Sequence, residues 1–278
     1  MQGLGKKLGE GATAEVYEFG EGYVIKVVKP TVSASIIDYE AWVTRTVSEA
    51  GALAPTVGEL LDVEGRHGFV MERVDGRPLL DLLLAGEMVP EACGRILAEL
   101  SYGLHGVSAT GTSLRTFHEF AGPMLDELEE RGCPDPLLAE GRRILATLDA
   151  GDAIVHGDMN PNNVLVTADG PRFIDWISAM RGNPMVDLAR IAVTFSVVLI
   201  PEWFHPGLTT DAFWDVRRCL LSAYLETYAA LAGTSPEVLE ADLAPWMTVM
   251  ATLALAEGTP DQQARIVSYL EQRMAEGA

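Results

Sequence analysis

Short apolar runs separated by turn-forming residues dominate the first part of the chain. The segments "EVYEFG" and "YVIKVV" are rich in β-branched and aromatic residues, and the "GEG" between them predicts a β-hairpin. "TVGELLDVEG" and "GFVMERV" predict a second hairpin by the same pattern. Between the hairpins, apolar residues at helical spacing in "SASIIDYEAWVTRTVSEAG" predict one helix, with Ser33 or Ser35 as its cap and Gly51 at its end.

A mostly helical pattern follows the turn signal "DGRP" at residues 75–78. Apolar residues recur every three or four positions, as in "PEACGRILAELSYGLHGV". Three short strands interrupt this pattern, "AIV", "NVLVT" and "RFIDW", and helices return after Pro184. The chain is therefore predicted to be an α+β protein of two lobes. Residues 1–74 form a small β-rich lobe with one helix, and residues 75–278 form a larger, mostly helical lobe.

Charge and composition narrow the classes of partner. The formal net charge is −20, which argues against nucleic acid because phosphate binding needs clustered cations. The negative field would attract a cationic partner, and a solvated acidic surface is the alternative explanation. The apolar run "IAVTFSVVLI" is far shorter than the ~20 residues of a membrane span and predicts a buried helix. The three cysteines show no pair spacing, and the start lacks the apolar stretch of a signal peptide. We expect a cytoplasmic protein without a membrane partner, and no particular oligomeric state is predicted.

The segment "HGDMNPNNVLV" at residues 156–166 lies between two predicted strands, where a rigid loop can present side chains to a cleft. Asp158 and Asn163 are five residues apart, and Asp175 ends the next strand, so a tight hairpin would bring Asn163 and Asp175 together. Two oxygen ligands suit Mg²⁺, and Asp158 would accept the proton of an attacking hydroxyl. Singly, the three residues could be an Asx-turn, a turn residue and a helix cap. Their combined spacing matches the catalytic loop and metal-binding aspartate of protein kinases.

Residues 1–74 contain further parts of that pattern. "GEGATAEVY" supplies a glycine-rich turn, with Gly9 and Gly11, before the first hairpin, and lacks the Gly-Lys-Ser/Thr of a Walker A loop. Lysine occurs only at positions 6, 7, 26 and 29, and Lys26 lies inside the apolar run "YVIKVV". Lys26 is therefore predicted to hold nucleotide phosphates, with Lys29 at the end of the strand as the competing candidate.

The predicted helix and the connector complete a nucleotide site. Glu40 is the expected partner of Lys26, with Asp38 as the alternative, and a solvated helix face is the other explanation for Glu40. In the connector "FVMERVDG", the backbone carbonyl of Glu72 and the amide of Val74 are predicted to face the base. ATP is the expected nucleotide. GTP can replace it, because only backbone groups would contact the base there.

With these motifs in place, the chain resembles the aminoglycoside phosphotransferase and choline kinase-like family over nearly its whole length. The segments that carry the resemblance are "VHGDMNPNNVLV", "FIDW" and "DLAR". The resemblance implies a protein kinase-like fold. It also implies a nucleotide-binding lobe at residues 1–74, and a catalytic and substrate-binding lobe at residues 75–278. Gly157 stands where a protein kinase has arginine, and eleven residues separate Asp175 from Asp187, which leaves no room for a long activation segment. A small-molecule hydroxyl is therefore the expected acceptor.

The leading functional hypothesis is an ATP- and Mg²⁺-dependent phosphotransferase acting on a small, cationic, aminoglycoside-like antibiotic. In this hypothesis Asp158 is the catalytic residue, Asn163 and Asp175 hold the metal, and Lys26 with Glu40 anchors the phosphates. The alternatives are a kinase of choline, a sugar, homoserine or a protein serine, and a nucleotide-binding module without catalysis. Four acidic residues of the C-terminal region are either candidates for the acceptor pocket or ordinary surface charges: Glu202, Asp211, Asp215 and Glu257. The aromatic residues of "EWFHPG" and Trp214 could stack on a ring of the acceptor or pack the core.

Overall fold

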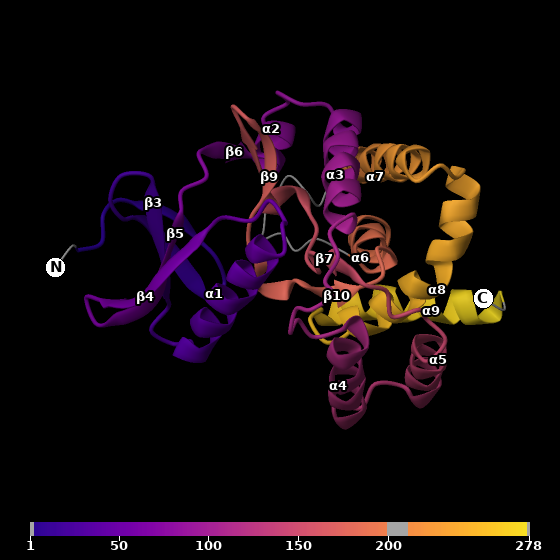
Figure 1. Ribbon diagram of the computed structural model, residues 1–278. Helices are drawn as coiled ribbons and strands as arrows, with labels where there is room; N and C mark the ends of the chain where they lie inside the picture. The colour runs from indigo at the N-terminus through magenta and orange to yellow at the C-terminus, as the bar shows by residue number, and fades with distance from the viewer. Residues whose placement is uncertain (1–2, 199–210, 277–278) are drawn as a thin grey trace.

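The computed structural model describes residues 3–198 and 211–276. Its N-terminal part is a five-stranded antiparallel sheet with helix α1 (Ala34–Glu49) packed on one face (Figure 1). Across the sheet the strands lie in the order β1 (Lys7–Glu10), β2 (Ala14–Glu18), β3 (Tyr23–Val28), β5 (Arg66–Glu72) and β4 (Val57–Val63). Both predicted hairpins are confirmed, as β2–β3 and β4–β5, and the predicted helix is α1, whose N-cap is Ser33.

Strand β3 is buried on both faces, which explains its nearly continuous apolar sequence. Val28 packs with Ile37 of α1, and Ile25 packs on the opposite side of the sheet. Because side chains alternate along a strand, Lys26 lies on the same face as Val28 and points toward α1. The predicted lysine is therefore placed under the helix that carries Glu40, whereas Lys29 forms an ion pair with Glu10.

The rest of the described chain is mostly helical and contains two small sheets, so the expected two-lobed α+β architecture is confirmed. Its helices are α2 (Leu79–Leu84), α3 (Pro90–His105), α4 (Phe117–Glu130), α5 (Asp135–Leu145), α6 (Met185–Ser196), α7 (Asp211–Leu231), α8 (Pro236–Ala254) and α9 (Pro260–Ala275). The strands are β6 (Gly76–Pro78), β8 (Val164–Thr167) and β9 (Gly170–Phe173) in one sheet, and β7 (Ala153–Val155) and β10 (Met180–Gly182) in the other.

Three of the strands were not predicted from the sequence. All four residues of β1 are exposed, so it lacks the apolar alternation of a half-buried strand. β6 and β10 have only three residues each and contain glycine or proline, which have low strand propensity. Both form because tertiary structure supplies a partner, β8 for β6 and β7 for β10.

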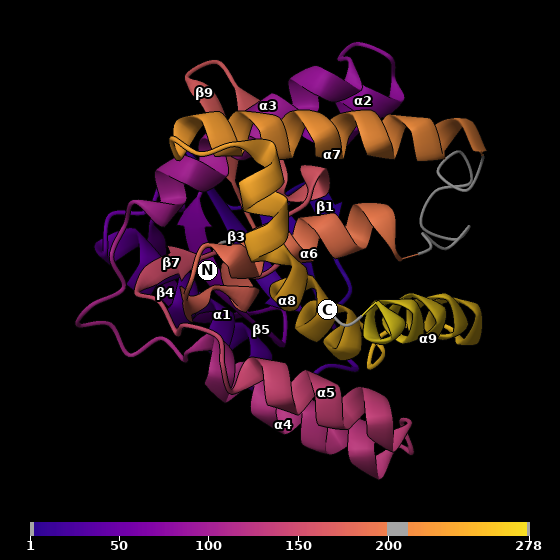
Figure 2. The ribbon, with the colours of Figure 1, turned by 90° about the vertical axis from the view of Figure 1, so that its right-hand side faces the viewer.

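Helices α3 and α7 pack closely in the C-terminal part (Figure 2). A Cβ at Gly94 of α3 would lie 2.3 Å from the carbonyl oxygen of Leu220 in α7, so the close approach requires glycine. The predicted buried helix of the run "IAVTFSVVLI" is α6 as far as Ser196, and Ile191 and Phe195 are buried. The last two residues of that run lie outside the described residues. Within the two described ranges, no helix is both long and apolar enough to cross a membrane.

Candidate active site

A buried carboxylate, Asp187 at the start of α6, holds the loop that follows β7. The backbone amides of His156 and Gly157 each donate to this carboxylate at 2.7 Å. The ring of His105, at the end of α3, lies 3.0 Å from the same carboxylate and 2.8 Å from the hydroxyl of Tyr228 in α7. Burial alone would raise the pKa of Asp187, but His105 and the backbone donors hold it below its usual value. The loop is therefore fixed by an ionised group that two helices support.

Gly157 has a left-handed backbone that accommodates glycine best. Its φ is 76°, and a Cβ there would lie 2.2 Å from the carbonyl oxygen of Ser178. The arginine that a protein kinase carries at this point does not fit without moving that carbonyl. His156 packs its ring against Phe173 and Trp176, with ring centroids 5.0 and 4.8 Å away. These contacts leave Asp158 as the first side chain of the loop that is partly open to solvent.

Asp158 and Asn163 are in direct contact. The side-chain amide of Asn163 donates to the carbonyl oxygen of Asp158 and to its Oδ2, both at 2.9 Å. The side-chain amide of Asn160 donates to the same carbonyl at 3.1 Å. A short 3₁₀ turn, Pro161–Asn163, links the two residues and leads directly into β8. The loop thus orients one carboxylate with two amide side chains.

Asp175 follows β9, one hairpin away from Asn163. The amide of Ile174 donates to the carbonyl of Asn163 at 2.9 Å, which places the next residue beside the loop. Asp175 has φ 63° and ψ 66°, and it is one of two non-glycine residues with positive φ in the described part of the chain. Such a conformation costs roughly 1–3 kcal/mol and concentrates at functional positions. Asp175 Oδ1 lies 3.1 Å from Lys26 Nζ, so it reaches across to the N-terminal sheet.

Lys26 pairs with Glu40 and Asp175 in a largely buried triad. Lys26 Nζ lies 2.5 Å from Glu40 Oε1, and the Glu40 side chain is 3% exposed. Burial opposes the Lys26 ammonium, but the Glu40 and Asp175 carboxylates outweigh it and raise the Lys26 pKa. Burial, together with the Asp175 carboxylate, also raises the pKa of Glu40 despite the neighbouring Lys26. Glu40 Oε2 is buried and has no hydrogen-bond partner among the described residues. One ammonium shared by two carboxylates leaves surplus negative charge.

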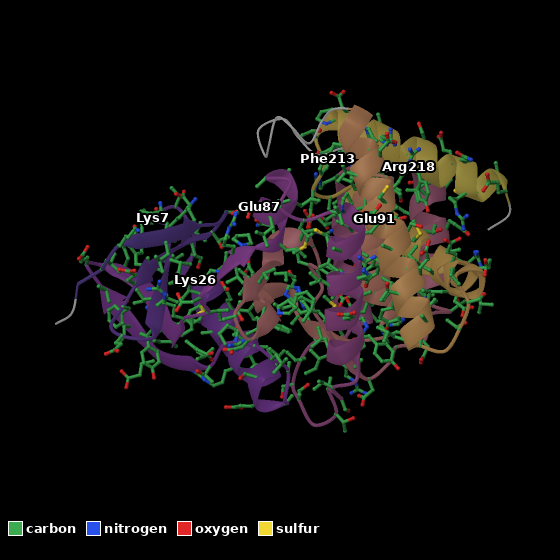
Figure 3. The ribbon with its side chains drawn as sticks, turned by 90° about the horizontal axis from the view of Figure 1, so that it is seen from above. Lys7, Lys26, Glu87, Glu91, Phe213 and Arg218 are labelled. Carbon is green, nitrogen blue, oxygen red and sulfur yellow. The ribbon has the colours of Figure 1, made fainter. Side chains whose placement is uncertain are left out.

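A cavity of about 460 Å³ opens over this triad, between the N-terminal sheet and the hairpin β8–β9. All the residues predicted to bind nucleotide or metal line it: Gly9, Gly11, Lys26, Glu40, Glu72, Val74, Asn163 and Asp175. Apolar residues line the cavity from both sides: Leu8, Val16, Val24 and Met71 from the sheet, Leu165 from β8, and Ile174 directly after β9. Figure 3 shows Lys26 within the sheet region and Lys7 at its outer rim.

The oxygen donors at this cavity suit a hard cation. Asn163 uses its amide nitrogen on Asp158, and its amide oxygen makes no hydrogen bond to any described residue. Asp175 is 42% exposed and contacts Lys26 through Oδ1. Mg²⁺ usually takes only one or two protein ligands, with water and phosphate oxygens filling its octahedron. The described residues contain no cluster of three or more His, Cys, Asp or Glu side chains that could hold an ion by themselves. Asn163 and Asp175 thus fit Mg²⁺ bound together with a nucleotide.

Two residues of this region were not predicted as site residues, Arg190 and His105. Arg190 lies three residues after Asp187 in α6, and its Nη2 is 3.3 Å from Asp158 Oδ1. The spacing in "DLAR" is a signal that could have found it, since residues three apart share a helix face. His105 offers no such signal, because its partners are 82 and 123 residues away in the sequence.

The candidates for the acceptor pocket lie in four different settings. Glu257 lies near Asp158, since its Oε2 is 3.6 Å from Arg190 Nη2. Asp215 is an exposed residue that pairs with Arg218 one turn away in α7. Two guanidinium groups lie over the ring of Trp214, that of Arg217 at 4.0 Å and that of Arg265 at 4.5 Å from the ring centroid. Glu202, the aromatic residues of "EWFHPG" and the side chain of Asp211 lie outside the described residues.

The comparisons with known proteins agree with this geometry. The sequence matches the Phosphotransferase enzyme family over residues 5–254, and the chain belongs to this family. It is 34% identical over 156 residues to viomycin phosphotransferase of Streptomyces vinaceus, a match that covers 47% of this chain and 51% of that protein. It is also 28% identical over 244 residues to the serine/threonine-protein kinase pkn2 of Myxococcus xanthus, covering 83% of this chain and 24% of the kinase. The chain thus spans about half the length of the first relative and about a quarter of the second.

Solved structures show the same fold at low identity. A choline/ethanolamine kinase family protein from Mesorhizobium loti superposes with a TM-score of 0.58 at 18% identity, covering 97% of this chain and 86% of that one. The streptomycin–ATP–APH(2'')-IIa ternary complex superposes with a TM-score of 0.56 at 18% identity, covering 96% and 90%. The protein kinase-like fold is therefore confirmed.

Proposed function

We propose that this member of the phosphotransferase enzyme family transfers the terminal phosphoryl group of ATP to a hydroxyl of a small cationic antibiotic. The observation that carries the proposal is that two groups of residues lie next to each other at one edge of the cavity. Lys26, Glu40 and Asp175 form a charged triad there. Asn163 binds Asp158 through its side chain, and its backbone carbonyl accepts the amide of Ile174, the residue before Asp175. A phosphate-binding cluster and a candidate base are thus adjacent, as in-line phosphoryl transfer requires.

The nucleotide would lie between the two apolar walls of the cavity. Gly9 and Gly11 border the phosphate end, and a Cβ at Gly9 would meet nothing within 4 Å, so open space lies beside it. The amides of Glu72 and Arg73 are used within the protein, whereas that of Val74 has no hydrogen-bond partner among the described residues. Val74 is therefore a free donor for the base. Because a backbone group reads the base, GTP remains the alternative donor, and the solved relatives include one complex with ATP and one with GDP.

Each polar residue of the site would have one role in the reaction. Lys26, held by Glu40, binds phosphate oxygens, and Asn163 and Asp175 hold Mg²⁺. The ion, when bound, neutralises charge on the transferred group. Asp158 orients the acceptor hydroxyl and takes its proton while the acceptor oxygen bonds to the terminal phosphorus. The bond from that phosphorus to the bridging oxygen breaks, and the nucleoside diphosphate leaves.

The acceptor class rests on charge and on the named relatives. A net charge of −20 favours a cationic molecule over an anionic one. The relatives are named for, or were solved with, viomycin, streptomycin and kanamycin. Gly157 and the short stretch between Asp175 and Asp187 argue against a peptide acceptor. A serine peptide still belongs in the test because of the likeness to a serine/threonine kinase.

The test is transfer of label from γ-labelled ATP to viomycin, streptomycin, kanamycin, choline, homoserine and a serine peptide. One of the three antibiotics should be phosphorylated with the highest kcat/KM. Asp158→Asn keeps the side-chain shape and should lower kcat by roughly 10²- to 10⁴-fold. The matched control is Asp169→Asn, an exposed aspartate in the β8–β9 turn, which should behave as the unmodified protein. An unchanged kcat in the Asp158→Asn variant would refute the proposal.

A further inference from the structure

Arg190 links the catalytic loop to the end of α8. Its Nη2 lies 3.3 Å from Asp158 Oδ1 and 3.6 Å from Glu257 Oε2. The Arg190 side chain is 25% exposed, so its charge is partly removed from solvent. Burial opposes that charge, but the carboxylates of Asp158 and Glu257 outweigh it and raise the Arg190 pKa. One cation therefore serves two carboxylates that belong to distant parts of the chain.

The contact with Arg190 completes the support of the Asp158 carboxylate. Oδ2 accepts the side-chain amide of Asn163 at 2.9 Å, and Oδ1 faces Arg190. With one partner on each oxygen, the carboxylate cannot turn about its last bond without losing one contact. Asn163 alone would leave Oδ1 free to turn toward solvent, since the Asp158 side chain is 35% exposed.

Glu257 competes for the same guanidinium nitrogen. Its separation of 3.6 Å is beyond hydrogen-bond length, and its side chain is 61% exposed at the junction of α8 and α9. Two carboxylates and one guanidinium together carry a net negative charge. A cationic group that binds Glu257 would remove this competition and leave Arg190 to Asp158 alone.

We propose that Arg190 is a positioning residue for Asp158, and that Glu257 shares it. A positively charged group of the acceptor that binds Glu257 then strengthens the interaction between Arg190 and Asp158. The inference rests on the proposed function, because it requires Asp158 to handle the acceptor hydroxyl. It adds that the acceptor carries its positive charge close to the reacting hydroxyl, within reach of both carboxylates.

The experiment compares Arg190→Lys, Arg190→Gln and Arg190→Ala with a surface control, Arg218→Gln, which removes an exposed pair on α7 (Figure 3). ATP turnover is measured with viomycin and with water as the only acceptor, and ATP affinity is measured by calorimetry. Loss of positioning should lower kcat about 10- to 100-fold for Arg190→Gln. The Kd for ATP should stay within about twofold, because Arg190 lies outside the nucleotide cavity.

Two readouts separate positioning from a structural role. Arg190→Lys should retain more activity than Arg190→Gln, and added guanidinium should restore part of the activity of Arg190→Ala but not of Asp158→Asn. Glu257→Gln should raise the KM for viomycin several-fold more than it lowers kcat.

If Arg190→Gln keeps full kcat while Asp158→Asn is inactive, the positioning role is wrong and the proposed function stands. If Arg190→Gln loses ATP affinity in parallel with kcat, Arg190 is structural. If Asp158→Asn is active, the proposed function itself fails.

Discussion

Gly157→Ala tests whether the loop before Asp158 depends on a residue without a side chain. The substitution adds one methyl group to a backbone with φ of 76°. The new Cβ would come within 2.2 Å of the carbonyl oxygen of Ser178, in the segment between Asp175 and β10. The perturbation thus acts where the two segments that carry Asp158 and Asp175 meet.

The cost has two parts that can be measured separately. A left-handed conformation costs an alanine about 1–2 kcal/mol relative to glycine. The overlap with Ser178 forces the backbone to move, and overpacking of this kind costs about 1–3 kcal/mol more. Gly65, in the β4–β5 turn, has φ of 78° and nothing within 4 Å of an added Cβ. Gly65→Ala therefore bears only the first cost, and the difference between the two variants isolates the steric part.

The assay is urea unfolding of both variants beside the unmodified protein, followed by ATP turnover with viomycin. Gly157→Ala should be the less stable variant by about 1–3 kcal/mol. Its kcat should fall at least about tenfold, because the next residue is Asp158. Gly65→Ala should keep its activity. Equal losses of stability in the two variants would refute the steric reasoning.

Three further substitutions probe the triad, the buried carboxylate and the guanidinium stack. Lys26→Met should raise the KM for ATP at least about tenfold, read from initial rates, because it leaves the phosphates without their ammonium; an unchanged KM would contradict the role of Lys26. The pKa of Asp187 is depressed in the folded protein, so its contribution to stability is present above the unfolded pKa of about 3.9 and is lost as pH falls through the folded pKa. Asp187→Asn should lower stability at neutral pH and reduce the loss of stability between neutral and acid pH, measured by unfolding at several pH values. An unchanged loss of stability toward acid pH would mean that other carboxylates cause it. Trp214→Ala removes the ring that contacts Arg217 and Arg265 and should lower stability by about 2–4 kcal/mol in thermal unfolding; unchanged stability would contradict a stabilising role of these contacts.

The fold was predictable where local pattern and tertiary structure agree. Strands β2, β3, β4 and β5 carry apolar residues at strand spacing and turn residues between them, so their pairing follows from the chain itself. Strands β1, β6 and β10 form because a neighbouring strand offers free backbone groups, which no local pattern records. The same holds for the packing of α3 on α7, where the need for Gly94 is visible only once both helices are placed.

The candidate site divides in the same way. Asp158, Asn163 and Asp175 lie within one loop and hairpin, so sequence spacing alone placed them together. Lys26 and Glu40 required a template, because 14 residues and a change from strand to helix separate them. The contacts of Arg190 and His105 join segments that are far apart in the sequence, and they depend on how the helical part packs.

The buried carboxylate of Asp187 has a consequence for the dynamics of the loop that it holds. Its carboxylate accepts the amides of His156 and Gly157, and through His105 it joins α6 to α3 and α7. Loop amides usually exchange their hydrogens quickly, because small local openings expose them to water. Exposing these two amides instead requires α6 to separate from the loop. The segment beside Asp158 should therefore exchange hydrogen as slowly as the helical core, and the acceptor would meet a base whose backbone is already rigid.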